Sequence, residues 1–220
     1  MTDDDEPLDI LEGEDLHVVG QKTRAQVHRD HDWHGAVFVW SAWESAGKRR
    51  MLLQKRGRSG DEFAQQVDAL AGGHIGAGET AIDAARRELT EEVGLLAGVD
   101  DFIHLGSRRS DRPVGECRRL FQHLLLYPVP LDIDRLRFSD EVDGFVEVDL
   151  QGFDDLVNDR CQHLPSRARY QRDGGPSQSM DLARTAILGY PDAILDTFRR
   201  SLASITTWLL VGRVDPVHFV

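Results

Sequence analysis

Residues 73–95, GHIGAGETAIDAARRELTEEVGL, decide how this sequence folds and what chemistry it suits. Their second half predicts an amphipathic helix, because its apolar residues recur at helical spacing and form one stripe. Thr80 is placed to cap the first turn, and Asp83 three residues later is typical of a weak capping box. Gly94 follows where a left-handed residue commonly ends a helix. We therefore expect a helix over residues 80–93, preceded by a glycine-rich loop.

Three glutamates of this helix, Glu88, Glu91 and Glu92, fall on one side of it, beside the apolar stripe. At about 100° per residue they span an arc of roughly 100°. Carboxylates this close repel one another, and a divalent cation such as Mg²⁺, which prefers oxygen ligands, would relieve that repulsion. Arg87 is placed to orient one of the carboxylates. The alternative is a salt-bridged amphipathic helix whose acidic face is simply solvated.

These residues also match a known motif. Gly73, five residues, Glu79, seven residues, and then Arg87-Glu88-Leu89-x-Glu91-Glu92-x-Gly94-Leu95 resembles the Nudix box, with every constrained position filled. The resemblance implies an α/β fold, namely an α/β/α sandwich around a mixed β-sheet. It also implies an activity, because family members hydrolyse a diphosphate linkage in substrates that join a nucleoside diphosphate to a second group.

The resemblance assigns roles by position in the box. Glu88, Glu91 and Glu92 would bind Mg²⁺ or Mn²⁺, with the Gly73 carbonyl as a further ligand, and Glu79 and Arg87 would orient Glu88. The predicted metal ligands are therefore Gly73, Glu88, Glu91 and Glu92. The predicted catalytic residues are Glu88, Glu91, Arg87 and Glu141. Glu88 is our first choice for the general base, and Glu141 in the loop FSDEVDG is the second.

A basic cluster precedes the box. Lys55, Arg56 and Arg58 lie toward the glycine-rich loop in the sequence and could grip a substrate phosphate. On a strand, alternate side chains point away from any one pocket, so a solvated hairpin explains the cluster about equally well.

The segment before the box indicates which branch of the family this chain resembles. Residues 27–40, VHRDHDWHGAVFVW, resemble the isopentenyl-diphosphate isomerase-like branch. Those isomerases need a cysteine just before the Gly-His pair of the box, where this chain has Gly72 before Gly73 and His74. In those isomerases the Arg-Glu and Glu-Glu parts of the box are also altered, whereas this chain keeps both. The sequence therefore favours a hydrolase over an isomerase, and over a non-catalytic nucleotide-sensing module, because such modules usually lose box carboxylates.

The histidines of this region allow two interpretations. His28 and His31 could share a helix face, and His34 starts a strand. The isomerase branch uses histidines from this region, together with the box histidine His74, to bind metal. We favour the other interpretation, in which His34 packs at the strand entrance and the remaining histidines of the segment are solvated.

The rest of the chain predicts one domain with an extension. We expect an acidic tail over residues 1–7, the Nudix domain over 8–158, and a loop plus helix over 159–220 packed on the same domain. The expected strands are 36–43, 49–56, a short strand within 67–76, 102–107, 120–129 and 142–148. The expected helices are 151–158 and one that starts at Pro191, and residues 163–180 are expected to be a long loop. The last helix either covers the sheet or forms a contact in a homodimer.

The amino-acid composition limits the classes of molecule that we expect the protein to bind. The 220 residues carry a net charge of −12, which argues against binding to nucleic acid polymers or anionic membranes, because both attract basic surfaces. No apolar run approaches the roughly 18 residues of a membrane span. The two cysteines, Cys117 and Cys161, match no zinc spacing and read as ordinary thiols of a cytoplasmic protein. We expect the partner to be a small-molecule diphosphate.

Overall fold

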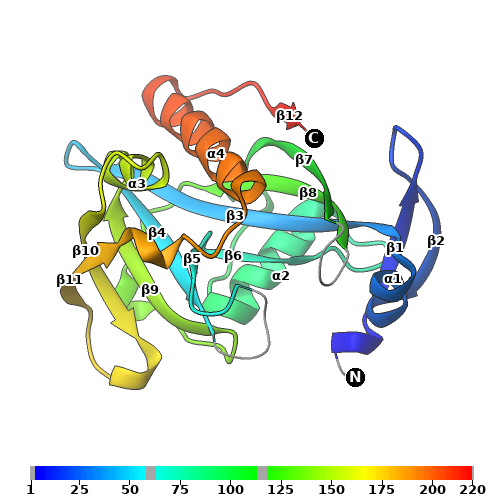
Figure 1. Ribbon diagram of the computed structural model, residues 1–220, viewed down its shortest axis with the longest axis horizontal. Helices are drawn as coiled ribbons and strands as arrows, with labels where there is room; N and C mark the ends of the chain where they lie inside the picture. Colours follow the sequence, from blue (N-terminus) through cyan, green and yellow to red (C-terminus); the bar gives the residue numbers. More distant parts are fainter. Residues whose placement is uncertain (1–2, 58–62, 113–117, 220) are drawn as a thin grey trace.

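A mixed β-sheet forms the centre of the protein (Figure 1). The computed structural model describes residues 3–57, 63–112 and 118–219. In order of pairing, the main strands are β11 (Gln178–Ala183), β10 (His163–Tyr170), β9 (Val142–Asp149), β4 (Lys48–Arg56), β3 (Trp33–Ser45), β8 (Arg118–Tyr127), β7 (Ile103–Arg112) and β12 (Val217–Phe219). The pairs β3–β8 and β7–β12 are parallel and the other neighbours along this path are antiparallel.

An N-terminal hairpin of β1 (Pro7–Glu12) and β2 (His17–Thr23) leads into the short helix α1 (Arg24–Asp30). The predicted acidic tail is more ordered than expected, since the 3-10 helix η1 (Asp3–Asp5) lies within it and its last residue, Pro7, opens β1. The reason is Leu8, which is fully buried and ties this end of the chain to the domain.

Helix α2 (Ala81–Val93) covers one face of the sheet. Thr80 caps it by accepting a hydrogen bond from the backbone N–H of Asp83, and Gly94 ends it at a φ of +74°. Its apolar stripe packs against residues of β3, β4 and β8, including Val37, Leu52 and others of the same buried cluster. The helix predicted from the sequence is therefore confirmed, with both of its caps.

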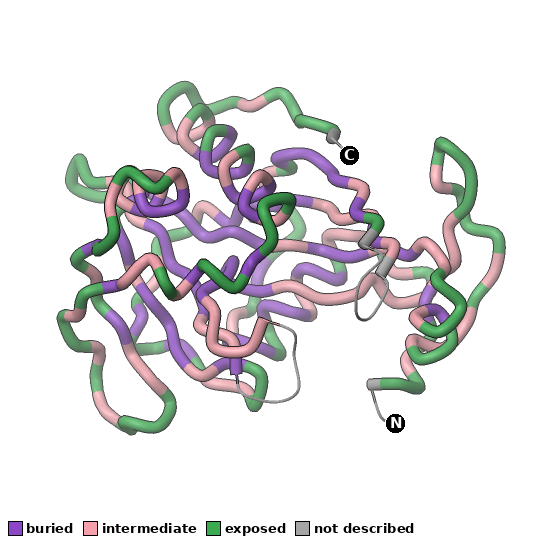
Figure 2. Tube along the Cα trace, viewed as in Figure 1, coloured by how far each residue is buried: buried purple, intermediate pink, exposed green. Residues whose placement is uncertain are grey.

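The opposite face is covered by α3 (Leu150–Val157) and α4 (Asp192–Val211). Phe198 of α4 meets the fully buried Trp40 of β3 edge to face, with the ring centres 5.0 Å apart. The C-terminal helix thus covers the sheet, which the sequence left open. Burial is concentrated between the layers (Figure 2), and the α/β/α sandwich with an added C-terminal helix is confirmed.

The prediction of a long loop over residues 163–180 is wrong. The segment forms β10 and the beginning of β11, which pair antiparallel and extend the sheet beyond β9. Pro165 precedes the first β10 residue paired with β9, a strand-end position that proline tolerates. Gly174, in the left-handed region, ends the 3-10 turn between the strands. Of the residues that suggested a loop, Gly174, Gly175 and Pro176 lie between the two strands, and Pro165 lies within β10, opposite Asp181 of β11.

Two short strands connect the sheet to α2: β5 (Val67–Asp68) pairs with β4, and β6 (Ala71–His74) pairs with β3. Successive residues of a strand face opposite sides of the sheet. Gly73 faces α2, and His74 faces away from it.

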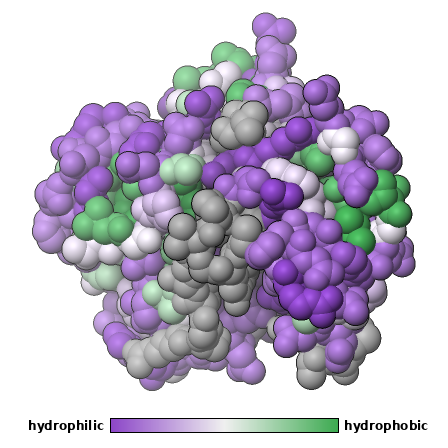
Figure 3. Space-filling model, turned by 45° about the vertical axis from the view of Figure 1, so that its right-hand side comes forward, coloured by the Kyte–Doolittle hydropathy of each residue, from purple (hydrophilic) through white to green (hydrophobic). Residues whose placement is uncertain are grey.

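The remaining helical turns are short. They are the 3-10 helices η2 (Val99–Asp101), η3 (Ile133–Arg135), η4 (Gln171–Asp173) and η5 (Arg184–Ala186). Hydrophilic residues dominate the face drawn in Figure 3, with hydrophobic ones in separate groups. Among the described residues, no helix combines the length and the apolar character needed to cross a membrane.

Candidate functional site

The glutamate cluster, Glu88, Glu91 and Glu92, lies on the side of α2 that meets β6. Glu88 and Glu92 are buried, with 8% and 4% of their surface exposed, whereas Glu91 is solvent-exposed. Burial of two carboxylates on neighbouring turns is costly unless positive charge or hydrogen-bond donors surround them. The cluster is thus not the solvated acidic face that an ordinary surface helix would present.

The glycines of β6 let the sheet backbone approach these carboxylates. A Cβ atom at Gly73 would collide with the Glu88 carboxylate, so no other residue fits there without displacing it. The backbone N–H of Gly72 lies 3.3 Å from Oε1 of Glu92 and donates to it. The glycine pair brings backbone groups directly against the acidic side chains.

Arg87 is bonded to most of the acidic residues of the box. Its guanidinium donates to both oxygens of Glu79 at 3.1 Å, to Oε1 of Glu88 at 2.7 Å and to Oε2 of Glu91 at 3.2 Å. A further bond of 2.8 Å goes to the backbone carbonyl of His74. Arg87 therefore fixes Glu88 relative to both Glu79 and β6.

The electrostatics of the cluster call for more positive charge than Arg87 provides. Burial raises the pKa of Glu88 to about 7, against the pull of Arg87. Burial, and then the charge of Glu88, raises the pKa of Glu92 well above its usual range. The negative charge of Glu141 raises both pKa values, so this exposed loop residue acts on the cluster as a further acidic group.

A divalent cation fits this donor set. Oε2 of Glu92 is buried and has no hydrogen-bond donor among the described residues. Carboxylate oxygens are the ligands that Mg²⁺ and Mn²⁺ prefer. A cation bound here would return the carboxylates to their ionised form, because a nearby positive charge lowers their pKa.

The predicted phosphate-binding cluster is divided in the structure. The ammonium of Lys55 lies 5.4 Å from the centre of the Tyr170 ring. Arg56 instead pairs with the buried Asp68, at 3.1 Å between Nη1 and Oδ2. Arg58 lies outside the described residues. The positive charge of Arg56 acts on Glu92 and lowers the pKa of that carboxyl group.

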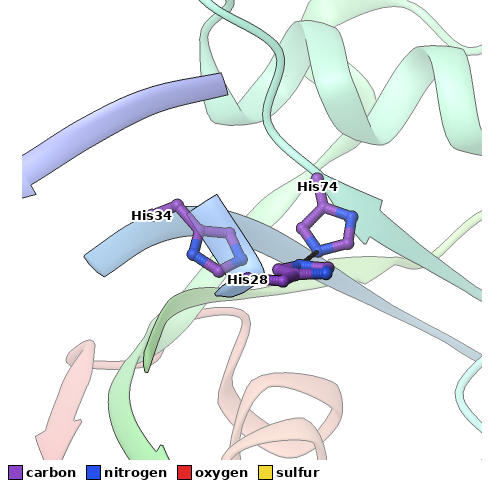
Figure 4. Close-up of side chains that lie close together, drawn as sticks. All are labelled: His28, His34 and His74. Carbon is purple, nitrogen blue, oxygen red and sulfur yellow. Dashed lines mark hydrogen bonds between the residues drawn. The ribbon is translucent and has the colours of Figure 1, made fainter. Parts of the chain in front are cut away.

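A histidine cluster lies on the other side of β6 (Figure 4). His28 of α1, His34 of β3 and His74 of β6 bring one ring nitrogen each to within 4.8 Å of one another. Nε2 of His28 and Nε2 of His74 are 3.3 Å apart. Ligands about 2.0–2.1 Å from a tetrahedral Zn²⁺ would be separated by about 3.3 Å, which the His28–His74 pair matches, while the nitrogen of His34 lies within 4.8 Å of both.

The sequence interpretation that we favoured is wrong for His28, which is half-buried and turned toward His74 rather than solvated. His34 is buried at the start of β3, as that interpretation expects, but it also lies in the histidine cluster, and His31 is exposed at the left-handed end of α1. Nδ1 of His34 lies 3.0 Å from the carbonyl oxygen of Asp32; a proton held there directs Nε2 toward the cluster.

No sequence spacing links His74 to the other two histidines. They meet because β6 pairs with β3, Ala36 opposite His74, while α1 folds back beside the start of β3. The six-residue separation of His28 and His34 across a helix end is a weak signal, and the resemblance of residues 27–40 to the isomerase branch was the stronger one.

The NUDIX domain model matches residues 12–166 of the chain. This chain belongs to the Nudix family. A solved structure of the protein DR0079 from Deinococcus radiodurans is similar to 70% of this chain and 90% of its own, with a TM-score of 0.54 and 21% identity. That likeness supports the Nudix fold.

Sequence relatives carry the same family name. An uncharacterized Nudix hydrolase of Clostridium acetobutylicum is 30% identical over 67% of this chain and 71% of its own length. Nudix hydrolase 3 of Arabidopsis thaliana is 29% identical over 82% of this chain, which spans only 23% of that protein. An isopentenyl-diphosphate delta-isomerase of Nocardia farcinica is 27% identical over 60% of this chain and 78% of its own, consistent with the predicted branch.

Proposed function

We propose that this Nudix protein is a pyrophosphohydrolase that uses Mg²⁺ or Mn²⁺ to hydrolyse the diphosphate linkage of a nucleoside diphosphate-type substrate. The observation that carries the proposal is the pair of buried carboxylates, Glu88 and Glu92, packed against the β6 glycines. Burial raises the pKa of both carboxylates, and the charge of a bound cation would favour their ionised forms. Names of the relatives, which include Nudix hydrolases, point in the same direction.

The residues divide into ligands and orienting groups. Glu88, Glu91 and Glu92 would hold the cation, with the carbonyl of Gly73 as a further ligand. When bound, Mg²⁺ or Mn²⁺ neutralises charge on the diphosphate and lowers the pKa of a bound water. Arg87, clamped by Glu79, holds Glu88 and Glu91 in position.

Two carboxylates are candidates for the general base. Glu88 is our first choice because it is buried, held by Arg87 and close to the backbone of β6. Glu141 is the second choice, since it is exposed on a loop whose charge reaches Glu88 and Glu92. A Glu141→Gln variant that keeps full turnover would leave the role to Glu88.

Two other functions are less well supported. An isomerase would need a thiol at the position of Gly72, where the close approach of the β3 backbone leaves little room for a side chain. A non-catalytic sensing module would have no need for the complete set of box carboxylates. We propose a small-molecule substrate and a cytoplasmic protein, because the chain is acidic and has only two cysteines.

The test is a screen of diphosphate compounds with Mg²⁺ and with Mn²⁺, in which release of phosphate or nucleoside monophosphate is measured. We expect metal-dependent turnover of at least one compound, lost in the double variant Glu91→Gln/Glu92→Gln. Glu44→Gln, an exposed glutamate at the far end of β3, is the matched control and should keep its activity. Turnover that survives the double variant would contradict the metal mechanism.

We also propose that the histidine cluster binds a transition metal. Imidazole nitrogen suits Zn²⁺, Co²⁺ or Ni²⁺ better than Mg²⁺. Binding of Co²⁺, followed by its visible absorption spectrum, should be stoichiometric in the wild type and lost in His74→Ala. His31→Ala is the control, because His31 lies outside the cluster. Co²⁺ absorption that is unchanged in His74→Ala would refute the assignment.

A further inference from the structure

The glycine-rich loop between β6 and α2 is bonded to the N-terminal strand β1. Leu8 of β1 and Gly76 of the loop form an antiparallel bridge, and the carbonyl oxygen of Pro7 accepts a hydrogen bond from the backbone N–H of Ala77 at 2.9 Å. Because β1 pairs with β2 on its other side, the loop takes the place of a further strand beside the N-terminal hairpin (Figure 1). The loop therefore has a fixed partner, although its own sequence is rich in glycine.

Asp9 adds a side-chain contact to this backbone pairing. Its Oδ2 accepts a hydrogen bond from the backbone N–H of Gly78 at 2.8 Å, and its Oδ1 accepts one from Nε2 of Gln21 on β2 at 3.0 Å. Gly78 has a φ of +75°, a conformation that glycine adopts without steric cost. The two oxygens of the Asp9 carboxylate thus contact two different segments, so β2 orients the carboxylate toward the loop.

Hydrogen bonds connect this loop to the glutamate cluster. The backbone N–H of Gly76 donates to Oε2 of Glu79 at 2.9 Å, and the N–H of Glu79 donates to the carbonyl oxygen of Gly76, also at 2.9 Å. Glu79 accepts two hydrogen bonds from Arg87. Arg87 also donates to Glu88 and to Glu91. A continuous series of contacts therefore runs from β1 to two of the three carboxylates that would hold the cation.

We propose that Asp9 is a positioning residue of the hydrolytic site. Its carboxylate, together with the backbone of β1, fixes the glycine-rich loop so that Glu79 holds Arg87 against Glu88. The inference rests on the proposed function of the glutamate cluster. A glycine-rich segment has more backbone conformations open to it than other segments have. Contacts that restrict it in advance therefore lower the entropy cost of ordering the site when the metal and the substrate bind.

Two neighbouring residues of β1 have different roles. Leu8 is fully buried and stabilises the fold, because burial of a leucine side chain removes a large apolar surface from water. Asp9 is only half-buried, and its two hydrogen bonds add less to stability. The NUDIX domain model begins at residue 12, so both residues precede the part of the chain that defines the family. Loss of the Asp9 carboxylate should therefore loosen the loop without unfolding the protein.

The first measurement is amide hydrogen exchange in the metal-free protein, which does not depend on turnover. Asp9→Ala should speed exchange at the amides of Gly76 and Gly78 by about threefold to tenfold, the effect of one lost hydrogen bond on local opening. The amide of Leu89, inside α2, should exchange at the wild-type rate. Asp9→Asn should exchange like the wild type, because its side-chain oxygen still accepts from Gly78 and its NH₂ group can pair with a reoriented Gln21 amide.

The second measurement is Mg²⁺-dependent turnover of a compound found in the diphosphate screen. Asp9→Ala should lower kcat about tenfold and change KM by less than about twofold, because Asp9 acts on the metal ligands and not on the substrate. Gln21→Ala, which removes the bond that orients Asp9, should lower kcat by less. In a Glu79→Gln background, Asp9→Ala should cause no further loss, because both act through Arg87. Glu12→Ala, an exposed acidic residue at the end of β1, is the matched control and should keep the wild-type exchange and turnover.

The inference is overturned by any of three results. These are unchanged exchange at Gly78 in Asp9→Ala, faster exchange there with an unchanged kcat, or a full additional loss in the Glu79→Gln background. Failure of the proposed function is distinct, since it would appear as absent metal-dependent turnover in the wild type. Calorimetric binding of Mg²⁺ then replaces turnover: we expect its Kd to rise about threefold to tenfold in Asp9→Ala, and an unchanged Kd would contradict the inference. Wild-type protein that also fails to bind Mg²⁺ would overturn both proposals.

Discussion

The two faces of β6 carry different chemistry within one residue of each other. Gly73 faces α2 and the glutamate cluster, where oxygen donors crowd together and two carboxylates are buried. His74 faces the other way and joins the histidine cluster, which offers neutral nitrogen donors. The type of donor atom therefore decides which cation each face suits, oxygen on the Gly73 side and imidazole nitrogen on the His74 side.

The two clusters also differ in what holds them without metal. The glutamates depend on Arg87, which bonds Glu79, Glu88 and Glu91 and also the carbonyl of His74. The histidines need no counter-charge, because neutral imidazoles can pack against one another, with ring centres 5.1–5.2 Å apart. Loss of a cation should therefore disturb the glutamate side more than the histidine side.

The largest expected effect comes from removing charge on the glutamate side. Glu91→Gln/Glu92→Gln should lower metal-dependent turnover by about 10³-fold, since metal-ion charge stabilisation is worth several kcal/mol. Co²⁺ absorption from the histidine cluster should stay at the wild-type level. Parallel loss of both signals would show that the two clusters are not separate sites.

A smaller effect is expected from the strand between the clusters. In Gly73→Ala the new methyl group would displace the Glu88 carboxylate, so turnover should fall about 10²-fold, as for other small misplacements of catalytic groups. The same substitution at Gly78, where a Cβ meets no atom within 4 Å but φ is +75°, controls for loss of a loop glycine. Equal losses of turnover in the two variants would show that the close contact between Gly73 and the Glu88 carboxylate is not the cause.

The histidine side should respond in the opposite way. His74→Ala is expected to weaken Co²⁺ binding by about 10- to 100-fold or more, as loss of a metal-site partner commonly does. Mg²⁺-dependent turnover should change by less than about threefold, because Arg87 bonds the backbone of His74 and not its ring. A large loss of turnover would place the histidine cluster within the hydrolytic site.

The smallest effect concerns stability against pH in the presence of a chelator. The pKa of Glu88 is about 7 in the folded protein and 4.5 in a model peptide, so the folded state holds this proton more tightly. Its contribution is present below pH 4.5 and is lost as the pH rises toward 7. The wild type should therefore lose on the order of 5 °C in melting temperature between pH 5 and 7.5, relative to Glu88→Gln.

Comparison with Glu88→Gln is necessary because burial lowers the pKa of His123 to about 4. Protonation of that histidine makes the protein less stable as the pH falls, which is the opposite dependence on pH. Because both the wild type and Glu88→Gln contain His123, its contribution cancels in the difference between their melting temperatures. Mn²⁺ should reduce the loss in the wild type and not in the variant. A flat difference with pH would mean that Glu88 is not buried as a carboxylate.

Local patterns were sufficient for the elements nearest the glutamate cluster. The helical stripe, Thr80 and Gly94 specify α2 with its caps, and the spacing of Glu88, Glu91 and Glu92 places them on one side. These features depend on residues within a few turns of each other. The β-branched and aromatic runs of β3 and β9 were recognisable for the same reason.

The features that sequence reasoning missed depend on tertiary pairing. The sequence of the β10–β11 hairpin resembles a loop because it has few buried residues. Those residues, such as Leu164 and Leu182, become buried only by packing in the core cluster that also contains residues of β9 and α3. His28 meets His74 across 46 residues, and Tyr190 meets Asp68 across 122. No local spacing signals such contacts.

The most direct measurement is the anomalous scattering of Mn²⁺ in crystals of the protein. We expect a peak among the carboxylates of Glu88, Glu91 and Glu92, close to the carbonyl of Gly73, and no such peak in Glu91→Gln/Glu92→Gln. No peak there, or a peak only at the histidine cluster, would show that the glutamate cluster is not the metal centre of a diphosphate hydrolase.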